Sequence, residues 1–426
     1  MQSGEVVELD VTGIAHGGVF VARHEGLVVF VPDALPGERI RARVTDVKKS
    51  FARAEALEVL DASPDRRAHV WAQADISVAP EGRPGGVDFG HIALPRQRAL
   101  KAQVLREAFE RFADTAIDVA VRGPEEVLGA DHAAVRGTAD GTHYRTRVSL
   151  HVDPEGRIGP YGARSHTVIP VDSHPLATPE IEEVALALRS APEGRIDLVQ
   201  PEDGRVRSIR RPARTGDRRR RFAPKPERAE PETVTERVGE REFLVDAGGF
   251  WQVHRAAAAT LDRAVRDALG ELSSDAWHLD LYGGVGLFAA ALGDLAGHAR
   301  ITTVESESRA TAHAEKNLEE FGAEAVTARV DRFLSRLSNQ ASMFDREMLT
   351  RGVTLLDPPR SGAGREVVEG IADLGSSRIA YVACDPVALA RDVGYFRGAG
   401  YELQSIEAYD LFPNSHHVEA VAVLAR

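Results

Sequence analysis

The sequence predicts an α/β protein with a C-terminal doubly wound, Rossmann-like sheet, preceded by a small β-barrel and a β-rich central domain. From residue 248 onward, apolar strand patterns alternate with helical patterns. Residues 1–60 contain short segments of alternating polarity between turn signals, and the stretch between these two parts returns to strand-like pieces. We therefore expect domains at 1–60, 61–247 and 248–426.

The first 60 residues have the spacing of a small barrel. Short strands are separated by turns rich in Gly, Pro and Asp, which is typical of small closed sheets. Such a barrel could bind RNA or dock another protein. The expected strands are 6–11, 19–23, 26–32, 39–47 and 51–60.

The middle of the chain is less regular. Residues 64–90 are rich in Pro, Gly and charge, whereas apolar side chains recur at helical spacing over about 95–113 and predict an amphipathic helix that packs on the C-terminal domain. Strand-like pieces follow, including 144–152 and 195–199. Between Arg205 and Arg228, eleven Arg or Lys residues face only two acids. This segment is either a solvated loop or a contact for RNA phosphates.

The C-terminal part reads as alternating strands and helices, finishing with two strands that we expect to be antiparallel. In such sheets, ligands bind beyond the carboxyl ends of the parallel strands. The expected strands are 277–281, 301–304, 353–356, 379–384, 401–409 and 419–425, with helices at about 256–269, from 288, and at about 310–321.

One stretch organises this part: a strand runs into the glycines of Tyr282-Gly-Gly-Val-Gly286, and a helix follows. Glycines let the backbone pass close under a ligand, and the new helix offers free N–H groups. About twenty residues later, Glu305 ends the next strand, where a carboxylate can accept ribose hydroxyls. The pair predicts a nucleoside cofactor. The loose dinucleotide pattern that includes Gly284 keeps NAD or FAD open, as it does an ordinary strand-to-helix turn.

Composition narrows the class. A chain of 426 residues with 43% hydrophobic and 28% charged residues is globular, and no apolar run is long enough to cross a bilayer. The start lacks a signal peptide, so we expect a cytoplasmic protein without membrane partners, and a monomer. The net charge of −12 argues against indiscriminate coating of nucleic acid. The single cysteine, Cys384, excludes an intrachain disulfide and leaves too few thiolates for an iron–sulfur cluster.

Further reactive residues follow the later strands. Asp357-Pro-Pro-Arg360 places a carboxylate at a strand end before a stiff loop. Cys384 ends another strand, where a thiol is either a small buried hydrophobe or a nucleophile. Near the C-terminus, two histidines and Glu419 suggest metal binding, but other candidate ligands are scattered, so we expect no metal.

These motifs resemble two known families. The run 26–38, Gly-Leu-Val-Val-Phe-Val-Pro and onward to Leu-Pro-Gly-Glu, resembles a TRAM domain, an OB-like barrel attached to RNA-modifying enzymes. Asp357-Pro-Pro-Arg360-x-Gly, Cys384, and the Asp-x-Phe-Pro-x-Ser-x-His417-x-Glu419 stretch together resemble the SAM-dependent RNA uracil-C5 methyltransferases, which make 5-methyluridine in tRNA and rRNA.

The resemblance implies a mechanism and a set of roles. Uracil C5 is a poor nucleophile, so a thiolate must add at C6, and a base must later remove the C5 proton. The resemblance implies that Cys384 is the nucleophile and Glu419 the base. Of the two RNA substrates, we favour rRNA slightly over tRNA. The residues implied to hold SAM are Gln252, Tyr282, Gly284, Gly286, Glu305 and Asp357, and those implied to bind the substrate are Arg360 and His417.

The chain also departs from this family. His254 stands where the family has Asn, and Ala383, Asp385 and Ala388 replace the usual Ser, Asn and Thr around the nucleophile. A carboxylate beside Cys384 should disfavour the thiolate. Pro84-Gly-Gly-Val and His174-Pro-Leu stand where some members carry cluster cysteines, so we expect no iron–sulfur cluster. A non-catalytic RNA-binding factor on the same scaffold is the alternative.

Overall fold

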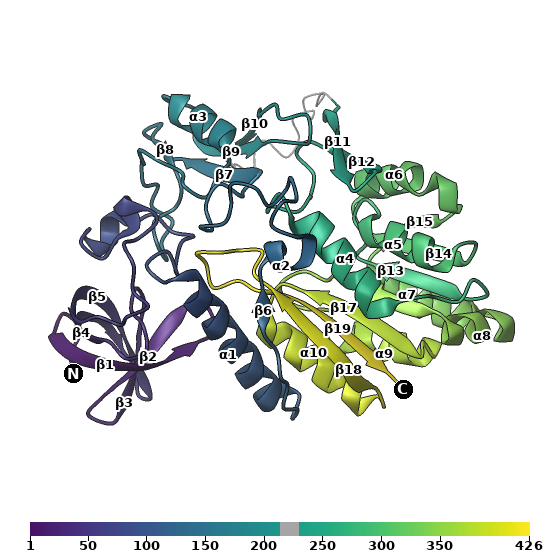
Figure 1. Ribbon diagram of the computed structural model, residues 1–426, viewed down its shortest axis with the longest axis horizontal. Coiled ribbons are helices and arrows are strands. Elements are labelled where there is room, and N and C mark those ends of the chain that lie inside the picture. Colours follow the sequence, from purple (N-terminus) through teal and green to yellow (C-terminus); the bar gives the residue numbers. More distant parts are fainter. Residues whose placement is uncertain (214–229) are drawn as a thin grey trace, which may run out of the picture. The chain divides into compact units, whose positions relative to one another are not determined.

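The computed structural model describes residues 1–213 and 230–426, which form two compact units (Figure 1). The predicted three-domain division at 1–60, 61–247 and 248–426 stays a prediction. Residues 214–228 of the basic segment lie outside the described residues, so the phosphate contact also stays a prediction. The first unit comprises Met1–Leu94, Asp140–Val234 and Asp246–Gly249, and the second Pro95–Ala139, Thr235–Val245 and Phe250–Arg426.

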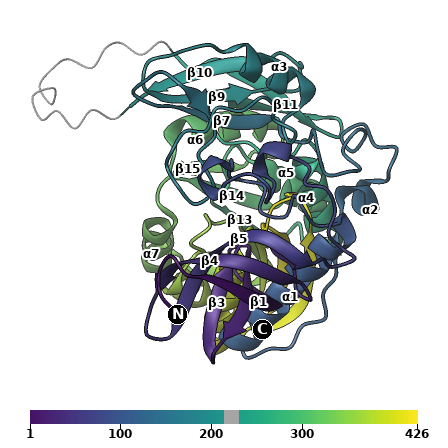
Figure 2. The same cartoon turned by 90° about the vertical axis from the view of Figure 1, so that its left-hand side faces the viewer.

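The N-terminal strands close into a barrel in the order β1-β2-β3-β5-β4, drawn in purple in Figures 1 and 2. Alternate side chains of each strand point inward, and Leu9, Phe20, Val29 and Ile40 are almost completely buried there. The predicted barrel is therefore confirmed. Its strands are β1 (Val6–Ala15), β2 (Val19–His24), β3 (Leu27–Val31), β4 (Arg39–Val47) and β5 (Phe51–Asp61).

The first unit also holds a four-stranded sheet in the order β10-β9-β7-β8. Leu150, Ile196 and Leu198 form one apolar face, and Ile181 of the helix α3 packs in the same core. The central part is thus β-rich, as predicted. Its elements are β7 (Arg147–Val152), β8 (Ile158–Gly159), α3 (Pro179–Ala187), β9 (Gly194–Val199) and β10 (Arg207–Pro212), with short 3-10 turns at Ala72–Ala74 and Pro80–Gly82.

An apolar cluster connects the irregular stretches of this unit. Val87 and Leu176 come from the two segments compared above with cluster-cysteine positions. Both are buried, and they pack together with Trp71 and Tyr144. Aliphatic and aromatic packing therefore joins these two segments.

The second unit is built on an eight-stranded sheet in the order β15-β14-β13-β16-β17-β19-β18-β6. Strands β15 to β17 are parallel neighbours, whereas β19 runs antiparallel to both β17 and β18. The expected antiparallel finish is confirmed. The strands are β6 (Val121–Arg122), β13 (Trp277–Leu281), β14 (Arg300–Glu305), β15 (Glu324–Thr327), β16 (Val353–Leu356), β17 (Arg378–Ala383), β18 (Glu402–Tyr409) and β19 (Glu419–Ala425), beside a hairpin of β11 (Thr233–Val238) and β12 (Arg241–Asp246).

Side chains of the central strand β13 alternate between two cores. Leu279 and Leu281 join the apolar cluster that α7, α9 and α10 share with the sheet, and Leu105 and Phe109 of α1 belong to the same cluster. Asp280 faces the opposite side, toward the backbone of Ala289 in α5. The helices are α1 (Leu94–Phe112), α2 (Pro124–Leu128), α4 (Ala257–Leu269), α5 (Leu287–Ala296), α6 (Ser308–Asn317), α7 (Val330–Gln340), α8 (Met343–Arg351), α9 (Arg365–Leu374) and α10 (Pro386–Gly398), with a 3-10 turn at Glu319–Phe321.

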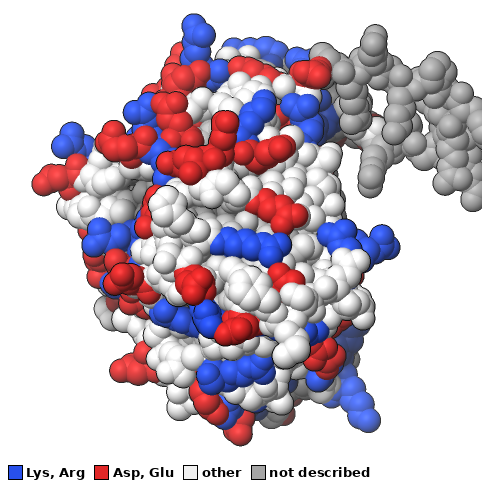
Figure 3. Space-filling view, turned by 90° about the vertical axis from the view of Figure 1, so that its right-hand side faces the viewer, with Lys and Arg blue, Asp and Glu red and all other residues white. Residues whose placement is uncertain are grey.

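The charge is well mixed on the face that Figure 3 presents, where acidic and basic side chains are interspersed. Pairs of opposite charge are common in this unit: Asp294, for example, forms ion pairs with both Arg241 and Arg266. Among the described residues, no helix is long and apolar enough to cross a membrane.

Candidate functional site

The glycine turn after β13 packs closely against the neighbouring strand β14. Tyr282, Gly284 and Gly286 have positive φ angles of 65°, 55° and 96°. A Cβ added to Gly283 would lie 2.0 Å from Oγ1 of Thr303, so no larger residue fits there without rearrangement. The turn leads directly into α5 and places its free N–H groups beside the carboxyl end of the sheet. Gly283 was not among the predicted site residues, because its constraint comes from the neighbouring strand.

Glu305 ends β14 next to this turn, as predicted. Its carboxylate accepts hydrogen bonds from the backbone N–H of Gly284 at 3.3 Å and of Glu307 at 2.7 Å, and from the Ser306 hydroxyl at 3.0 Å. These bonds fix the carboxylate at the mouth of the turn. The carboxylate is only half-buried, so its exposed part can accept hydrogen bonds from the hydroxyl groups of a ligand.

Asp280 lies beneath the turn and was missed by the sequence analysis. It is completely buried, and its Oδ2 accepts a hydrogen bond from Thr303 at 3.0 Å. Burial raises its pKa to about 7, and the nearby Glu305 acts in the same direction. Its Oδ1 has no hydrogen-bond partner within the described part of the chain. The sequence does contain a signal that could have identified Asp280 as a site residue: it is a lone carboxylate inside an apolar strand.

Asp357 follows β16 and is half-buried at its carboxyl end. Burial, with Asp280 as the second cause, raises its pKa to about 7. The loop after it is held by Asp392 of α10, a second residue that the sequence analysis missed. Asp392 is completely buried, and its Oδ2 accepts from the Ala363 N–H at 2.7 Å and the Tyr381 hydroxyl at 2.8 Å.

Cys384 and Glu419 are brought together by strand register. β17 and β19 are antiparallel, and their last pair joins Ala383 to Ala420. Continuing this register by one residue sets Cys384 opposite Glu419, so that both side chains project on the same side of the sheet. The carboxylate and the thiol, 35 positions apart in the sequence (419 − 384), are thus neighbours in space.

The surroundings of Cys384 oppose ionisation of its thiol. The side chain is half-buried, and burial raises its pKa to about 12, with the carboxylates of Glu419 and Asp357 as the next causes. Asp385 adds to the shift as a smaller cause, in the direction that the sequence predicted, whereas Arg360 opposes it. The Asp385 carboxylate caps α10 by accepting the Ala388 N–H at 2.8 Å.

Glu419 is buried, with 6% of its surface exposed. Burial and the neighbouring Asp357 hold the pKa of its carboxyl well above the ordinary range, and Arg360 acts in the opposite direction. Arg360 lies close to His417, with 3.4 Å between its Nη2 and the histidine Nε2. The two predicted substrate residues are therefore adjacent.

Gln252 lies half-buried in the segment that leads into α4, between the buried Trp251 and His254. His254 Nδ1 accepts the backbone N–H of Ala256 at 2.9 Å. This ring nitrogen makes the local bond to the residue two positions on that a short Asn side chain commonly makes. The substitution of His for the family's Asn therefore keeps a turn-forming acceptor.

Metal ligands do not gather in this unit. Among the described residues there is no group of three or more His, Cys, Asp or Glu side chains that could hold a metal ion. The rings of His416 and His417 instead contact each other, with centroids 4.1 Å apart, and the His417 ring also contacts Phe412 at 5.7 Å.

Comparisons with known proteins show the family of the chain. The family model of the TRAM domain matches residues 2–57, and that of tRNA (uracil-5-)-methyltransferase matches residues 237–426. A protein of Streptomyces avermitilis named as an uncharacterized RNA methyltransferase is 38% identical, covering 99% of this chain and 98% of its own. A Bifidobacterium longum protein of the same description is 35% identical over 98% of this chain and 96% of its own.

A solved structure shares the fold over nearly the whole chain. It is that of Pyrococcus abyssi tRNA (uracil-54, C5)-methyltransferase in complex with S-adenosyl-L-homocysteine. The match has a TM-score of 0.64 at 20% identity, and covers 98% of this chain and 100% of the other. The predicted fold class is thus confirmed. The chain belongs to the tRNA (uracil-5-)-methyltransferase family and is a SAM-dependent RNA methyltransferase with an N-terminal TRAM domain.

Proposed function

We propose that the enzyme methylates C5 of a uridine in structured RNA through a covalent bond between Cys384 Sγ and C6 of the base. The observation that carries this proposal is the register that sets Cys384 opposite Glu419 at the end of β17. A nucleophile and a base on the same side of one sheet edge can act on the two adjacent carbons of a single pyrimidine.

The two side chains would act in sequence. The Cys384 thiol gives its proton to water, and the thiolate adds to C6 and makes C5 a nucleophilic enolate carbon that attacks the methyl group. Bound SAM would supply that methyl group as an electrophile. Glu419 then removes the proton from C5, and the C6–Sγ bond breaks as the double bond returns. A buried carboxyl with a raised pKa suits the last step, because its anion is a stronger base than an exposed glutamate.

The glycine turn supports placement of SAM beside this pair. We assign the ribose hydroxyls to Glu305, whose carboxylate is already oriented by backbone N–H groups. We assign the rest of the nucleoside to the open side of Gly284, where an added Cβ would meet no atom within 4 Å, beside the start of α5. Gly286 packs instead against Leu318. Gln252, Tyr282 and Asp357 complete the proposed cofactor site.

The substrate uridine must leave a helical stack, because the edge that reacts is covered inside a duplex. Arg360 and His417 lie next to each other at the surface edge of the site, and we propose that they hold the uridine. We propose rRNA as the first candidate substrate and tRNA as the second. The Pyrococcus neighbour is named for a tRNA position, so both RNA pools need testing.

The test is a denaturing gel with substrate RNA, labelled SAM and single-residue variants. Glu419→Gln should permit attack and methyl transfer but block release, leaving a slow-migrating protein–RNA band. Cys384→Ala and the double variant should lack this band. A band that persists without Cys384 would overturn the assignment, since the chain has no other thiol.

Nucleoside mass spectrometry of rRNA and tRNA from cells with and without the gene identifies the product. Loss of 5-methyluridine from one pool names the substrate. Unchanged 5-methyluridine in both pools, together with RNA binding by the purified protein, would instead support the non-catalytic alternative.

A further inference from the structure

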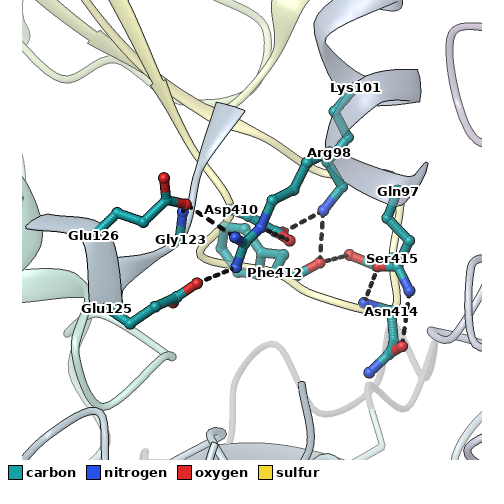
Figure 4. Close-up of polar contacts among 10 residues, drawn as sticks. All are labelled: Gln97, Arg98, Lys101, Gly123, Glu125, Glu126, Asp410, Phe412, Asn414 and Ser415. Carbon is teal, nitrogen blue, oxygen red and sulfur yellow. Dashed lines mark hydrogen bonds and ion pairs between the residues drawn. The ribbon is translucent and has the colours of Figure 1, made fainter. Parts of the chain in front are cut away.

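The loop that joins β18 to β19, residues 410–418, is attached to one face of α1 by buried polar contacts (Figure 4). This loop ends directly before Glu419 and carries His417. Arg98 of α1 also lies near the loop, with 3.6 Å between its Nε and Oδ2 of Asp410. The two buried partners on α1 are Gln97 and Lys101, one helical turn apart. Neither side chain takes part in the chemistry proposed above, although both are almost completely buried.

Gln97 makes a reciprocal pair with Asn414. The Gln97 Nε2 donates to Asn414 Oδ1 at 3.0 Å, and the Asn414 backbone N–H donates to Gln97 Oε1 at 2.7 Å. Asn414 has a positive φ of 64°, a left-handed conformation in which Asn is enriched among the residues other than glycine. The pair thus fixes both the side chain and the backbone at the tip of the loop.

Lys101 holds the start of the loop. Its Nζ lies 2.5 Å from Oδ1 of Asp410 and donates to the Phe412 carbonyl at 3.0 Å. Both charged side chains are fully buried. Replacing a buried ion pair by apolar side chains is often neutral for stability, so stability alone is a weak reason for such a pair. What it supplies is one defined loop geometry.

The anchored start is adjacent to the proposed base. Asp410 directly follows Tyr409, which is the strand partner of Glu419 in the β18–β19 ladder. The first fixed residue of the loop and the first residue after it are therefore neighbours across the sheet. A loop released from α1 would change the position of His417 and of Glu419 before it affected the distant glycine turn.

We propose that Gln97 and Lys101 are positioning residues that hold the 410–418 loop so that Glu419 can release the methylated uridine from Cys384. This inference rests on the proposed function. It assigns to α1 a specific effect on the last step of the reaction, in addition to its packing on the sheet.

The test compares Gln97→Met and Lys101→Met with Gln103→Ala, a control on the same helix whose side chain makes an exposed contact with Glu107. Single-turnover experiments on RNA measure methyl transfer and adduct decay separately. Each Met variant should slow adduct decay by roughly tenfold or more, the effect of one lost buried hydrogen bond. With RNA at saturating concentration, which offsets weaker binding through His417, methyl transfer and SAM affinity should change little. The control should match the wild type.

Two further variants separate positioning from unfolding. Gln97→Glu keeps an acceptor for the Asn414 N–H and should restore part of the decay rate. Lys101→Met combined with Asp410→Leu removes the buried charges together, which should preserve folding while the bond to Phe412 stays absent and decay stays slow. Melting curves of all variants show that they are folded.

Equal slowing of methyl transfer and adduct decay, or unchanged decay in a folded variant, would overturn this inference. Failure of the proposed function has a different signature: methylation that survives in Cys384→Ala. The adduct in Lys101→Met should disappear when Cys384→Ala is added, which ties the measured species to this thiol.

Discussion

Replacing Glu419 by Gln should make Cys384 more reactive, and the single cysteine makes this measurable. An aromatic disulfide reagent that releases a coloured thiolate reports only on this residue. The pKa of Cys384 is raised to about 12, with burial as the first cause and Glu419 as the second. A raised pKa lowers the thiolate fraction at any given pH, and removing a like charge increases it again.

The magnitude follows from the pKa. At about pH 9.5, a thiol of pKa about 12 is roughly 0.3% ionised, whereas an unperturbed thiol is roughly 90% ionised, a difference of about 300-fold. A thiolate of higher pKa is also more nucleophilic, with a Brønsted slope of about 0.45. This greater nucleophilicity offsets about 40-fold of the 300-fold difference in thiolate fraction. The native protein should therefore react about tenfold more slowly than the same protein in denaturant.

Glu419→Gln should lower the pKa of Cys384, and every tenfold gain in the thiolate fraction increases the observed rate about threefold. The assay is the initial rate of thiol modification, measured from about pH 8 to pH 10. Glu402→Gln, an exposed carboxylate at the start of β18, is the matched control and should change nothing. A wild-type rate that levels off near pH 8.5, or a Glu419→Gln rate equal to the wild type, would refute the reasoning.

Three further predictions concern the cofactor turn and its supports. Glu305→Ala should weaken SAM binding by roughly 1–3 kcal/mol, the cost of leaving polar groups unpaired, and calorimetry showing equal affinity in a folded variant would contradict the placement. Gly283→Ala puts a Cβ 2.0 Å from Thr303 Oγ1, so SAM affinity should fall together with the melting temperature; a variant unchanged in both would show that the turn adapts freely. Asp392→Ala removes the acceptor of the Tyr381 hydroxyl and of the Gly364 N–H, and one of the two acceptors of the Ala363 N–H. It should lower the free energy of unfolding by roughly 3–5 kcal/mol, which urea titration measures against Asp373→Ala on the surface.

Local patterns determined most of the architecture. Strands such as 277–281, 353–356 and 419–425 were predicted at their observed limits, because short, mostly apolar segments between turn signals leave few alternatives. The four-residue strand β15 and the helices α7 to α10 were not predicted. β15 is only partly buried, so its sequence lacks a clear apolar pattern.

The sequence alone also located the ends of the strands, and with them Tyr282, Glu305, Asp357 and Cys384. A residue that follows a parallel strand must lie at the carboxyl edge of the sheet whatever the order of the strands. The position of such a residue at the ligand-binding edge of the sheet can therefore be inferred before any of its contacts is known. The role of each residue came from the family resemblance.

Only the tertiary structure decided which residues support these positions. Asp392 accepts from a loop about thirty residues away, and Gln97 meets Asn414 across more than three hundred residues. A buried polar side chain gives no periodic signal, because its partner is selected by the packing of whole elements and not by sequence spacing. The insertion of β19 between β17 and β18 is of the same kind, and it is this strand order that sets Glu419 opposite Cys384.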